Sequence, residues 1–203
     1  MTIEKGFPSD QPTDQIPFYL IRDMIGGEIY AYKGWQEVVN QTKTLEQIMG
    51  CSGLQSFILE YLQAILFTQI GRKKYRFFTN ETGNHLAKNE NPSFDLAIYE
   101  RALLTPDKIT TKYVDVPPKV VVEVDVKVDT RLLSEMDFVH HKTQTLLNYK
   151  VEKVIWIFTK SKKVLIATPD EDWITMDWNR NIEFIDGVHF NIGKEIKNEG
   201  LII

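Results

Sequence analysis

The stretch Val120–Asp129, with the sequence VVVEVDVKVD, does most to decide the fold of this chain. From Val122 onward, valine alternates with charged residues. Successive side chains of a β-strand point to opposite faces, so the alternation predicts a strand with one apolar face and one charged face. Pro117 and Pro118 precede it, and they should mark its start because proline cannot donate into a central ladder. We therefore expect a strand within residues 114–128.

The charged face of this strand carries the first candidate site. Glu123 and Asp125 stand two positions apart, roughly 6–7 Å on one face, and Lys127 follows on the same face. Two carboxylates at that distance repel each other unless a cation lies between them or solvent screens them. A hard divalent cation takes oxygen ligands of this type. A strand whose charged face is merely solvated would show the same alternation, so both interpretations stay open.

A further acid occupies a similar position upstream. In the segment 94–99, with the sequence FDLAIY, Asp95 is expected on the face opposite to Leu96 and Ile98. Aspartate is disfavoured within strands, so an aspartate at this position suggests a specific structural or functional role. Either Asp95 is a ligand that joins Glu123, or it begins the strand or caps a turn.

A long helix expected at residues 132–149 adds a cation. Phe138, Lys142, Leu146 and Tyr149 follow one another at spacings that place them on one helix face. An outward face seldom carries three such apolar residues, so Lys142 should lean toward the sheet or extend to its edge. If it points inward it needs anionic partners, and the Asp95 and Glu123 pair is the natural candidate.

The remaining segments predict an α/β chain. Residues 18–32 suggest a hairpin with its turn at 25–28, and residues 52–70 suggest a long helix that ends at Gly71. A short helix is expected near 45–49, and further strands at 73–79, 154–159, 164–168, 173–176 and 182–185. This order predicts a mixed sheet with helices packed on it. We expect one domain over residues 18–203, preceded by a loose lead-in at residues 1–17.

Composition limits the class of protein. The chain has 203 residues and a net charge of −4, so no general basic surface draws it to nucleic acid, although a local cleft can be basic. Its single cysteine, Cys51, excludes an intrachain disulfide and a cysteine-based zinc site. The first residues lack the apolar core of a signal peptide, and no apolar run reaches the ~18 residues that span a bilayer. We expect a cytoplasmic protein.

Two short segments resemble the signature of the PD-(D/E)XK nucleases, in which an aspartate and a (D/E)-x-K triplet lie on adjacent strands. Residues 92–95, PSFD, resemble the first half, and Asp125-Val126-Lys127 spells the second half literally. More of the chain is similar to the Uma-two-type family of restriction-endonuclease-like proteins. The matching segments are LIRDMIGGE at 20–28, PKVVVEV at 118–124, residues 137–149 and VEKVIWI at 151–157.

The family resemblance implies an α/β fold with a restriction-endonuclease-like mixed β-sheet flanked by α-helices, an N-terminal hairpin and a C-terminal β extension. It makes Glu123 the second acid, places Asp125 where a lysine usually stands, and implies a lysine relocated to the helix, which matches Lys142. The literal motif uses Asp125 and Lys127 instead. We prefer Asp95, Glu123 and Lys142, with Asp125 and Lys127 as secondary candidates.

The resemblance further implies an endonuclease that hydrolyses DNA with Mg²⁺ or Mn²⁺. Asp95 and Glu123, helped by Asp125, would bind the metal, which lowers the pKa of a bound water, while a lysine assists. A basic stretch that contains aromatic residues is a candidate for contacting phosphates, or else a protected strand edge, and it comprises Arg72, Lys73, Lys74 and Arg76. A homodimer would suit paired cuts. Two alternatives remain, namely an inactive nuclease-fold module for nucleic-acid binding or assembly, and an unrelated α/β protein with solvated acids.

Overall fold

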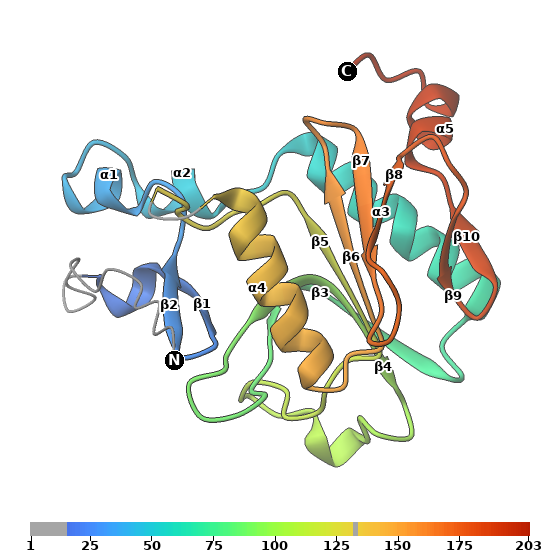
Figure 1. The fold of residues 1–203 in the computed structure, drawn as a ribbon, viewed down its shortest axis with the longest axis horizontal. Helices are drawn as coiled ribbons and strands as arrows, with labels where there is room; N and C mark the ends of the chain where they lie inside the picture. Colours follow the sequence, from blue (N-terminus) through green and yellow to red (C-terminus); the bar gives the residue numbers. More distant parts are fainter. Residues whose placement is uncertain (1–15, 132–133) are drawn as a thin grey trace, which may run out of the picture.

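The computed structural model describes residues 16–131 and 134–203, and it consists of a central sheet between two layers of helix (Figure 1). The sheet has six strands in the order β3-β4-β5-β6-β7-β8. All neighbouring strands are antiparallel except β5 and β6, which are parallel. The mixed sheet expected from the sequence is therefore confirmed. Its strands are β3 (Tyr75–Gly83), β4 (Ser93–Glu100), β5 (Val120–Val124), β6 (Lys153–Phe158), β7 (Lys163–Ala167) and β8 (Ile174–Asp177).

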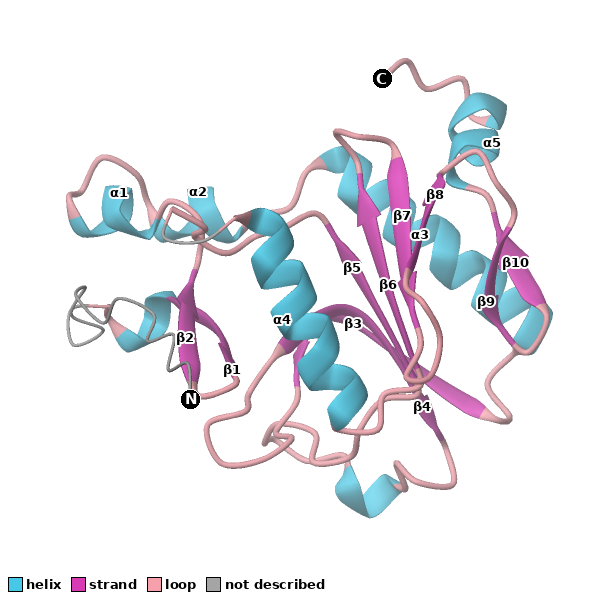
Figure 2. Cartoon of the chain, in the orientation of Figure 1, coloured by secondary structure: helices cyan, strands magenta, loops and turns pink. Residues whose placement is uncertain are grey.

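Two hairpins and several helices complete the described chain (Figure 2). The hairpins are β1 (Ile21–Ile25) with β2 (Glu28–Ala31), and β9 (Ile182–Ile185) with β10 (Val188–Phe190). The α-helices are α1 (Trp35–Val39), α2 (Leu45–Met49), α3 (Gly53–Ile65), α4 (Glu135–Asn148) and α5 (Ile192–Asn198). The sequence did not predict α1, β10 or α5. Residues 1–15 of the expected lead-in and residues 132–133 of the expected helix lie outside the described residues.

Helix α4 covers one face of the sheet and is the crossover that parallel strands β5 and β6 require (Figure 1). Ser134 begins it, because its hydroxyl accepts a hydrogen bond from the Asp137 backbone and the Asp137 carboxylate accepts one from the Ser134 backbone in return. Phe138, Val139, Leu146 and Leu147 pack in one core with sheet residues such as Val121 and Trp156. The buried side of α4 therefore faces β5.

Helix α3 covers the opposite face. Ser52 and Gln55 form the same reciprocal cap at its start. Ile58, Leu62 and Ile65 pack in a second core with residues of β4, β5 and β6, and the β9–β10 hairpin and α5 add to that core. Every residue of β5 is buried, since both of its faces are covered. Among the described residues, no helix has the length and apolarity needed to cross a membrane.

Strand β5 is shorter than the sequence predicted, because the chain turns at Asp125. That residue has φ of +59°, in the left-handed region that ends the extended conformation. Its carboxylate accepts hydrogen bonds from the backbone nitrogen of Thr159 at 2.7 Å and from the Thr159 hydroxyl at 2.6 Å. These hydrogen bonds offset part of the conformational strain that a left-handed backbone imposes on a non-glycine residue.

The turn at Asp125 also changes which core the valines join. Val122 and Val124 pack in the core beneath α3. Val126 and Val128 pack in the core beneath α4. The expectation that all alternate valines from 120 to 128 share one face is therefore wrong, because a single left-handed residue interrupts the two-residue repeat of the strand.

Candidate functional site

Asp95 and Glu123 lie across from each other on neighbouring strands. β4 and β5 are antiparallel, with Leu96 paired to Val122, so the next position along each strand brings Asp95 opposite Glu123. Both are buried, with 2% and 1% of their surface exposed. The two carboxylates flank one cation, because Nη2 of Arg22 lies 3.8 Å from an Asp95 oxygen and 3.5 Å from a Glu123 oxygen. The strands thus produce the convergence that the sequence suggested.

The Asp95 carboxylate is held at both oxygens. Oδ2 accepts a hydrogen bond from the backbone nitrogen of Val124 at 2.8 Å. Oδ1 accepts one from Nζ of Lys127 at 2.7 Å. A carboxylate fixed by one backbone donor and one ammonium has a defined orientation toward Glu123, which a freely rotating side chain would lack.

Lys142 points inward, as its place on the apolar face of the helix suggested. Its ammonium is fully buried and lies 2.7 Å from Oε1 of Glu123 and 3.1 Å from Oδ2 of Asp23. It also donates to the backbone oxygen of Ser93 at 2.9 Å. The ring of Phe94 lies 5.6 Å from the ammonium, within the range of a cation–π contact. Oxygens from two side chains and one backbone carbonyl therefore surround this buried nitrogen.

Arg22 and Asp23 also belong to this site, and the sequence reasoning did not identify them. Successive strand residues normally point to opposite faces, but the pairing of β1 with β2 shifts register between Ile21 and Asp23. This irregularity brings both side chains into the cluster, where Nη1 of Arg22 lies 2.8 Å from Oδ2 of Asp23. A charged pair inside the apolar run of residues 20–25 was the signal that could have identified them.

Glu81 forms the solvent-facing edge together with Lys127. It lies on an irregular part of β3, where Asn80 and Glu81 have φ of +70° and +52°. Its Oε1 is 3.6 Å from Nζ of Lys127, and its Oε2 accepts a hydrogen bond from the Tyr32 hydroxyl at 2.9 Å. The side chains of Glu81 and Lys127 are 25% and 16% exposed, so solvent reaches the cluster from this side.

The cluster contains more carboxylates than cations. The cations are Arg22, Lys127 and Lys142, and the carboxylates that pair with them are Asp23, Glu81, Asp95 and Glu123. Burial raises the pKa of Glu123 to about 7, opposed by the charge of Lys142 and assisted by that of Asp95. Burial also works to raise the pKa of Asp23, but Lys142 and Arg22 outweigh it and hold that pKa below its usual value. Of these two buried acids, Glu123 therefore takes up a proton more readily than Asp23.

Several buried atoms of the cluster lack a hydrogen-bond partner. They are Nε and Nη2 of Arg22, Oε1 of Glu81 and Oε1 of Glu123. Oε1 of Glu123 is close to the Lys142 ammonium, but the contact is an ion pair whose angles do not suit a hydrogen bond. Unpartnered buried polar atoms are uncommon in folded proteins, and they mark places where a ligand or ion can complete the arrangement.

These residues fit a divalent metal ion by their chemistry. Asp95 and Glu123 supply hard oxygen donors from two strands, and Glu123 keeps an oxygen free of hydrogen bonds. Within residues 16–131 and 134–203, no three Asp, Glu, His or Cys side chains are already grouped as a metal site. Mg²⁺ retains several waters and can be held by one or two carboxylates, so the donor atoms of this pair are compatible with it.

Asp125 does not join the cluster, which corrects the expectation that it shares a face with Glu123. Its carboxylate points toward the α3 side, where it accepts from Thr159 and lies 3.3 Å from Nε2 of Gln55. The left-handed conformation of Asp125 changes the direction of the chain. Lys127 still contacts Asp95, but it does so from the segment after this turn and not from the same strand face as Glu123. Lys127 is therefore part of the site, and Asp125 is separated from it by the strand.

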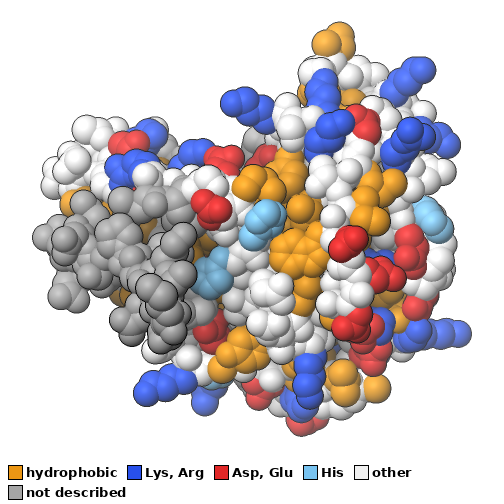
Figure 3. All heavy atoms as spheres, in the orientation of Figure 1, with side chains coloured by type: hydrophobic (Ala, Val, Ile, Leu, Met, Phe, Trp, Pro, Cys, Tyr) orange, Lys and Arg blue, Asp and Glu red, His pale blue; other side chains and the backbone are white. Residues whose placement is uncertain are grey.

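The basic stretch at Arg72, Lys73, Lys74 and Arg76 lies away from the carboxylates. Arg76 pairs with Tyr99 in the sheet, four residues along β4 from Asp95, which is roughly 13 Å. Arg76 donates to the backbone oxygen of Leu104, and Lys74 forms an ion pair with Asp186. On the face seen in Figure 3, Lys and Arg side chains are dispersed and Asp and Glu lie among them. The structure does not bring this stretch and the cluster together.

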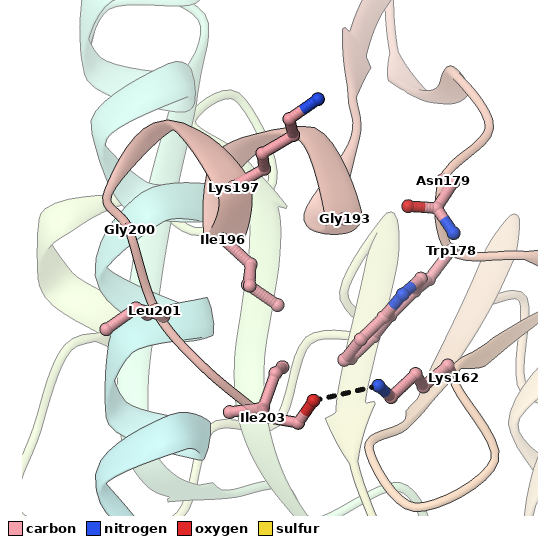
Figure 4. A pocket seen from close by; sticks show the side chains of 9 residues that line it. All are labelled: Lys162, Trp178, Asn179, Gly193, Ile196, Lys197, Gly200, Leu201 and Ile203. Carbon is pink, nitrogen blue, oxygen red and sulfur yellow. Dashed lines mark hydrogen bonds between the residues drawn. The ribbon is translucent and has the colours of Figure 1, made fainter.

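A hollow near the C-terminal end of the chain is also separate from the cluster. Figure 4 shows it between α5 and the turn that precedes β7, with Lys162, Trp178 and Lys197 among the residues that line it. Nζ of Lys162 donates to the backbone oxygen of Ile203 at 3.1 Å and lies 5.8 Å from the Trp178 ring. No Asp or Glu side chain is among the residues that line the hollow, so it does not resemble a metal site.

Comparison with known proteins supports the fold. No family model matches the sequence, and no curated protein matches it significantly. Among solved structures, the chain is similar to a candidate nuclease belonging to DUF820 from Anabaena variabilis. The TM-score is 0.63 and the sequence identity is 11%, over 86% of this chain and 89% of that one. The chain therefore has the restriction-endonuclease-like fold, a mixed sheet flanked by helices.

Proposed function

We propose that this protein is a divalent-metal-dependent nuclease that hydrolyses DNA phosphodiester bonds at the Asp95 and Glu123 pair. The observation that carries the proposal is the position of these two buried acids, opposite each other on β4 and β5 with lysines beside them. The fold shared with a candidate nuclease supports it. So does the resemblance of the sequence to the PD-(D/E)XK signature.

In this proposal Asp95 and Glu123 hold the metal. When bound, Mg²⁺ polarises the phosphate and lowers the pKa of a bound water. The Val124 backbone nitrogen orients Asp95, and the Lys142 ammonium keeps Glu123 in place and favours its charged form. Each carboxylate is thus oriented by a neighbour of its own before a metal ion binds.

The two lysines have different roles because they differ in burial. Lys142 is enclosed by Glu123, Asp23 and the backbone of Ser93, so it is a positioning residue. Lys127 lies at the solvent edge, with 16% of its side chain exposed. It is the lysine placed to meet the substrate, where its charge would stabilise the phosphate as negative charge develops on it.

Cleavage assays with Mg²⁺ and with Mn²⁺ test the proposal. We expect the wild type to cleave supercoiled or linear DNA only with metal, and Asp95→Asn to lose both cleavage and Mn²⁺ binding measured by calorimetry. Asp177→Asn is a matched control, since Asp177 is a half-exposed carboxylate paired with Lys163 in β7, far along the sheet order from β4. Cleavage that persists at the wild-type rate in Asp95→Asn would contradict the proposal.

A second candidate function is a nuclease-fold module that binds nucleic acid without cutting it. One specific observation favours it, namely that cations already occupy the positions beside both acids. Arg22 lies between Asp95 and Glu123, and Lys127 holds Asp95 at 2.7 Å. In that case the wild type would bind DNA equally well with EDTA and with Mg²⁺, and no metal would restore cleavage.

A further inference from the structure

The guanidinium of Arg22 uses only one side in the folded protein. Its Nη1 donates to Oδ2 of Asp23 at 2.8 Å. Its Nε and Nη2, which form the opposite edge, are buried and have no hydrogen-bond partner. An arginine carries five N–H donors in a fixed planar fork, so an empty edge leaves two parallel donors pointing in one direction.

The oxygens nearest to this edge are too far away to satisfy it. Nε is 3.8 Å from Oε1 of Glu81. Nη2 is 3.5 Å from Oε2 of Glu123 and 3.8 Å from Oδ1 of Asp95. Charge-assisted N–H···O bonds are about 2.7–2.9 Å long, so these contacts are attractions between charges without directed hydrogen bonds.

The position of Arg22 is fixed by neighbours that do not use this edge. Asp23, the residue beside it, accepts from the backbone nitrogen of Ser93 at 2.7 Å and from Lys142 at 3.1 Å. Arg22 lies at the register shift in β1 and Asp23 directly follows it, which keeps the arginine inside the cluster. A donor pair held in place before a ligand arrives binds that ligand with little loss of conformational freedom.

We propose that Arg22 is a phosphate-binding residue of this site and that its Nε and Nη2 donate in parallel to two oxygens of a phosphodiester. This inference rests on the proposed function, because a metal ion on Asp95 and Glu123 offsets the repulsion that the phosphate would otherwise meet. Lys127 completes the subsite from the solvent edge, where it lies 3.6 Å from Glu81. The simpler alternative is that Arg22 only supplies positive charge among the carboxylates.

Replacing Arg22 with lysine separates the two explanations, because lysine keeps the charge but has no planar fork. Fluorescence anisotropy would measure binding of a labelled DNA duplex with Ca²⁺ in place of Mg²⁺, which avoids turnover. We expect Arg22→Lys to bind about tenfold or more weakly, as loss of a charge-assisted hydrogen bond implies. Arg101→Lys is the matched control, because Nε of Arg101 is also buried without a partner but lies beyond the far end of β4. It should bind like the wild type.

Binding by Arg22→Lys at wild-type affinity would overturn the inference, and so would a wild type that binds no DNA with or without Ca²⁺. The outcome is independent of cleavage, since weak binding by Arg22→Lys supports the phosphate subsite even if no metal restores cutting. If Arg22→Lys melts well below the wild type, NMR of the unmodified protein decides the question. The Nε–H signal of Arg22 should shift and exchange more slowly when an unlabelled duplex is added, and an unchanged signal would refute the subsite.

Discussion

Lys142 and Glu123 form a fully buried ion pair, with 2.7 Å between Nζ and Oε1, although they come from a helix and a strand on either side of a loop. The β5–α4–β6 crossover makes this contact possible, because α4 returns across the face of the sheet on which Glu123 lies. Removing one member of a buried pair leaves the other charge without compensation, which is costly. The pair therefore links the stability of the fold to the geometry of the proposed active site.

Lys142→Met should destabilise the protein strongly. It leaves Asp23 and Glu123 buried beside a side chain without charge, and breaking a buried pair costs about 3–5 kcal/mol. Urea unfolding followed by circular dichroism would measure the change in the free energy of unfolding. Lys33→Met is the control, because Lys33 pairs with Glu135 in solvent, where such pairs contribute less than about 1 kcal/mol. Equal losses for both variants would contradict the prediction.

The stability of the protein should fall in acid in a way that depends on Asp23. Its pKa is below the usual value in the folded state because Lys142 and Arg22 outweigh the effect of burial. A carboxyl group with a lowered pKa stabilises the folded state above its unfolded pKa of about 3.9, and that contribution disappears as the pH falls through the folded pKa. Asp23→Asn should therefore flatten the acid side of the stability profile.

Unfolding free energies at a series of pH values from about 6 downward would test this dependence. Asp170→Asn, at an exposed carboxylate, controls for the loss of a charge as such. The prediction fails if Asp23→Asn and the wild type lose stability with the same slope over this range.

Gly26→Ala should disturb the contact between the β1–β2 turn and α4. An added Cβ would lie 2.3 Å from Nε2 of His141, whose ring is fixed by a hydrogen bond of 2.7 Å between Nδ1 and the Tyr30 hydroxyl. Gly27→Ala is a close control, because Gly27 also has a positive φ but has open space around it. Overpacking costs about 1–3 kcal/mol, so Gly26→Ala should be less stable than Gly27→Ala by that amount. Similar melting temperatures for the two variants would argue against the contact.

Asp125→Asn should leave metal binding close to that of the wild type, because Asp125 faces Thr159 and Gln55 and is separated from Glu123 by the strand. Asparagine tolerates the left-handed conformation, so the turn should persist. One weakened charge-assisted bond to Thr159 should reduce stability by about 1–3 kcal/mol. Mn²⁺ titration of Asp125→Asn beside Asp95→Asn measures the difference. If both variants lose Mn²⁺ binding equally, the prediction is wrong and Asp125 belongs to the metal site.

The sequence predicted those parts of the site that depend on short-range periodicity. The helix spacing around Lys142 favoured a side chain that leans toward the sheet, and the alternation on either side of Asp95 and Glu123 favoured acids that oppose an apolar face. Both patterns persist in the structure because each lies within one regular element. Periodicity is a reliable guide as long as the backbone conformation repeats from residue to residue.

The site residues that the sequence did not reveal lie where that repetition breaks. Arg22 enters the cluster through a register shift in β1, and Glu81 through a part of β3 with positive φ. Asp125 leaves the cluster for the same reason, since one left-handed residue turned the chain and ended β5. Such irregularities depend on tertiary partners, among them Thr159 for Asp125, which lies far away in the sequence.

By itself, the sequence determined the α/β class, the order of the main elements and the acids of β4 and β5, because local periodicity and turn residues encode these features. Only the tertiary structure decided which charges meet, how deeply they are buried and which donors of Arg22 remain free. The physical reason is that burial and ion pairing arise between segments far apart in the chain, where no repeat in the sequence records the contact.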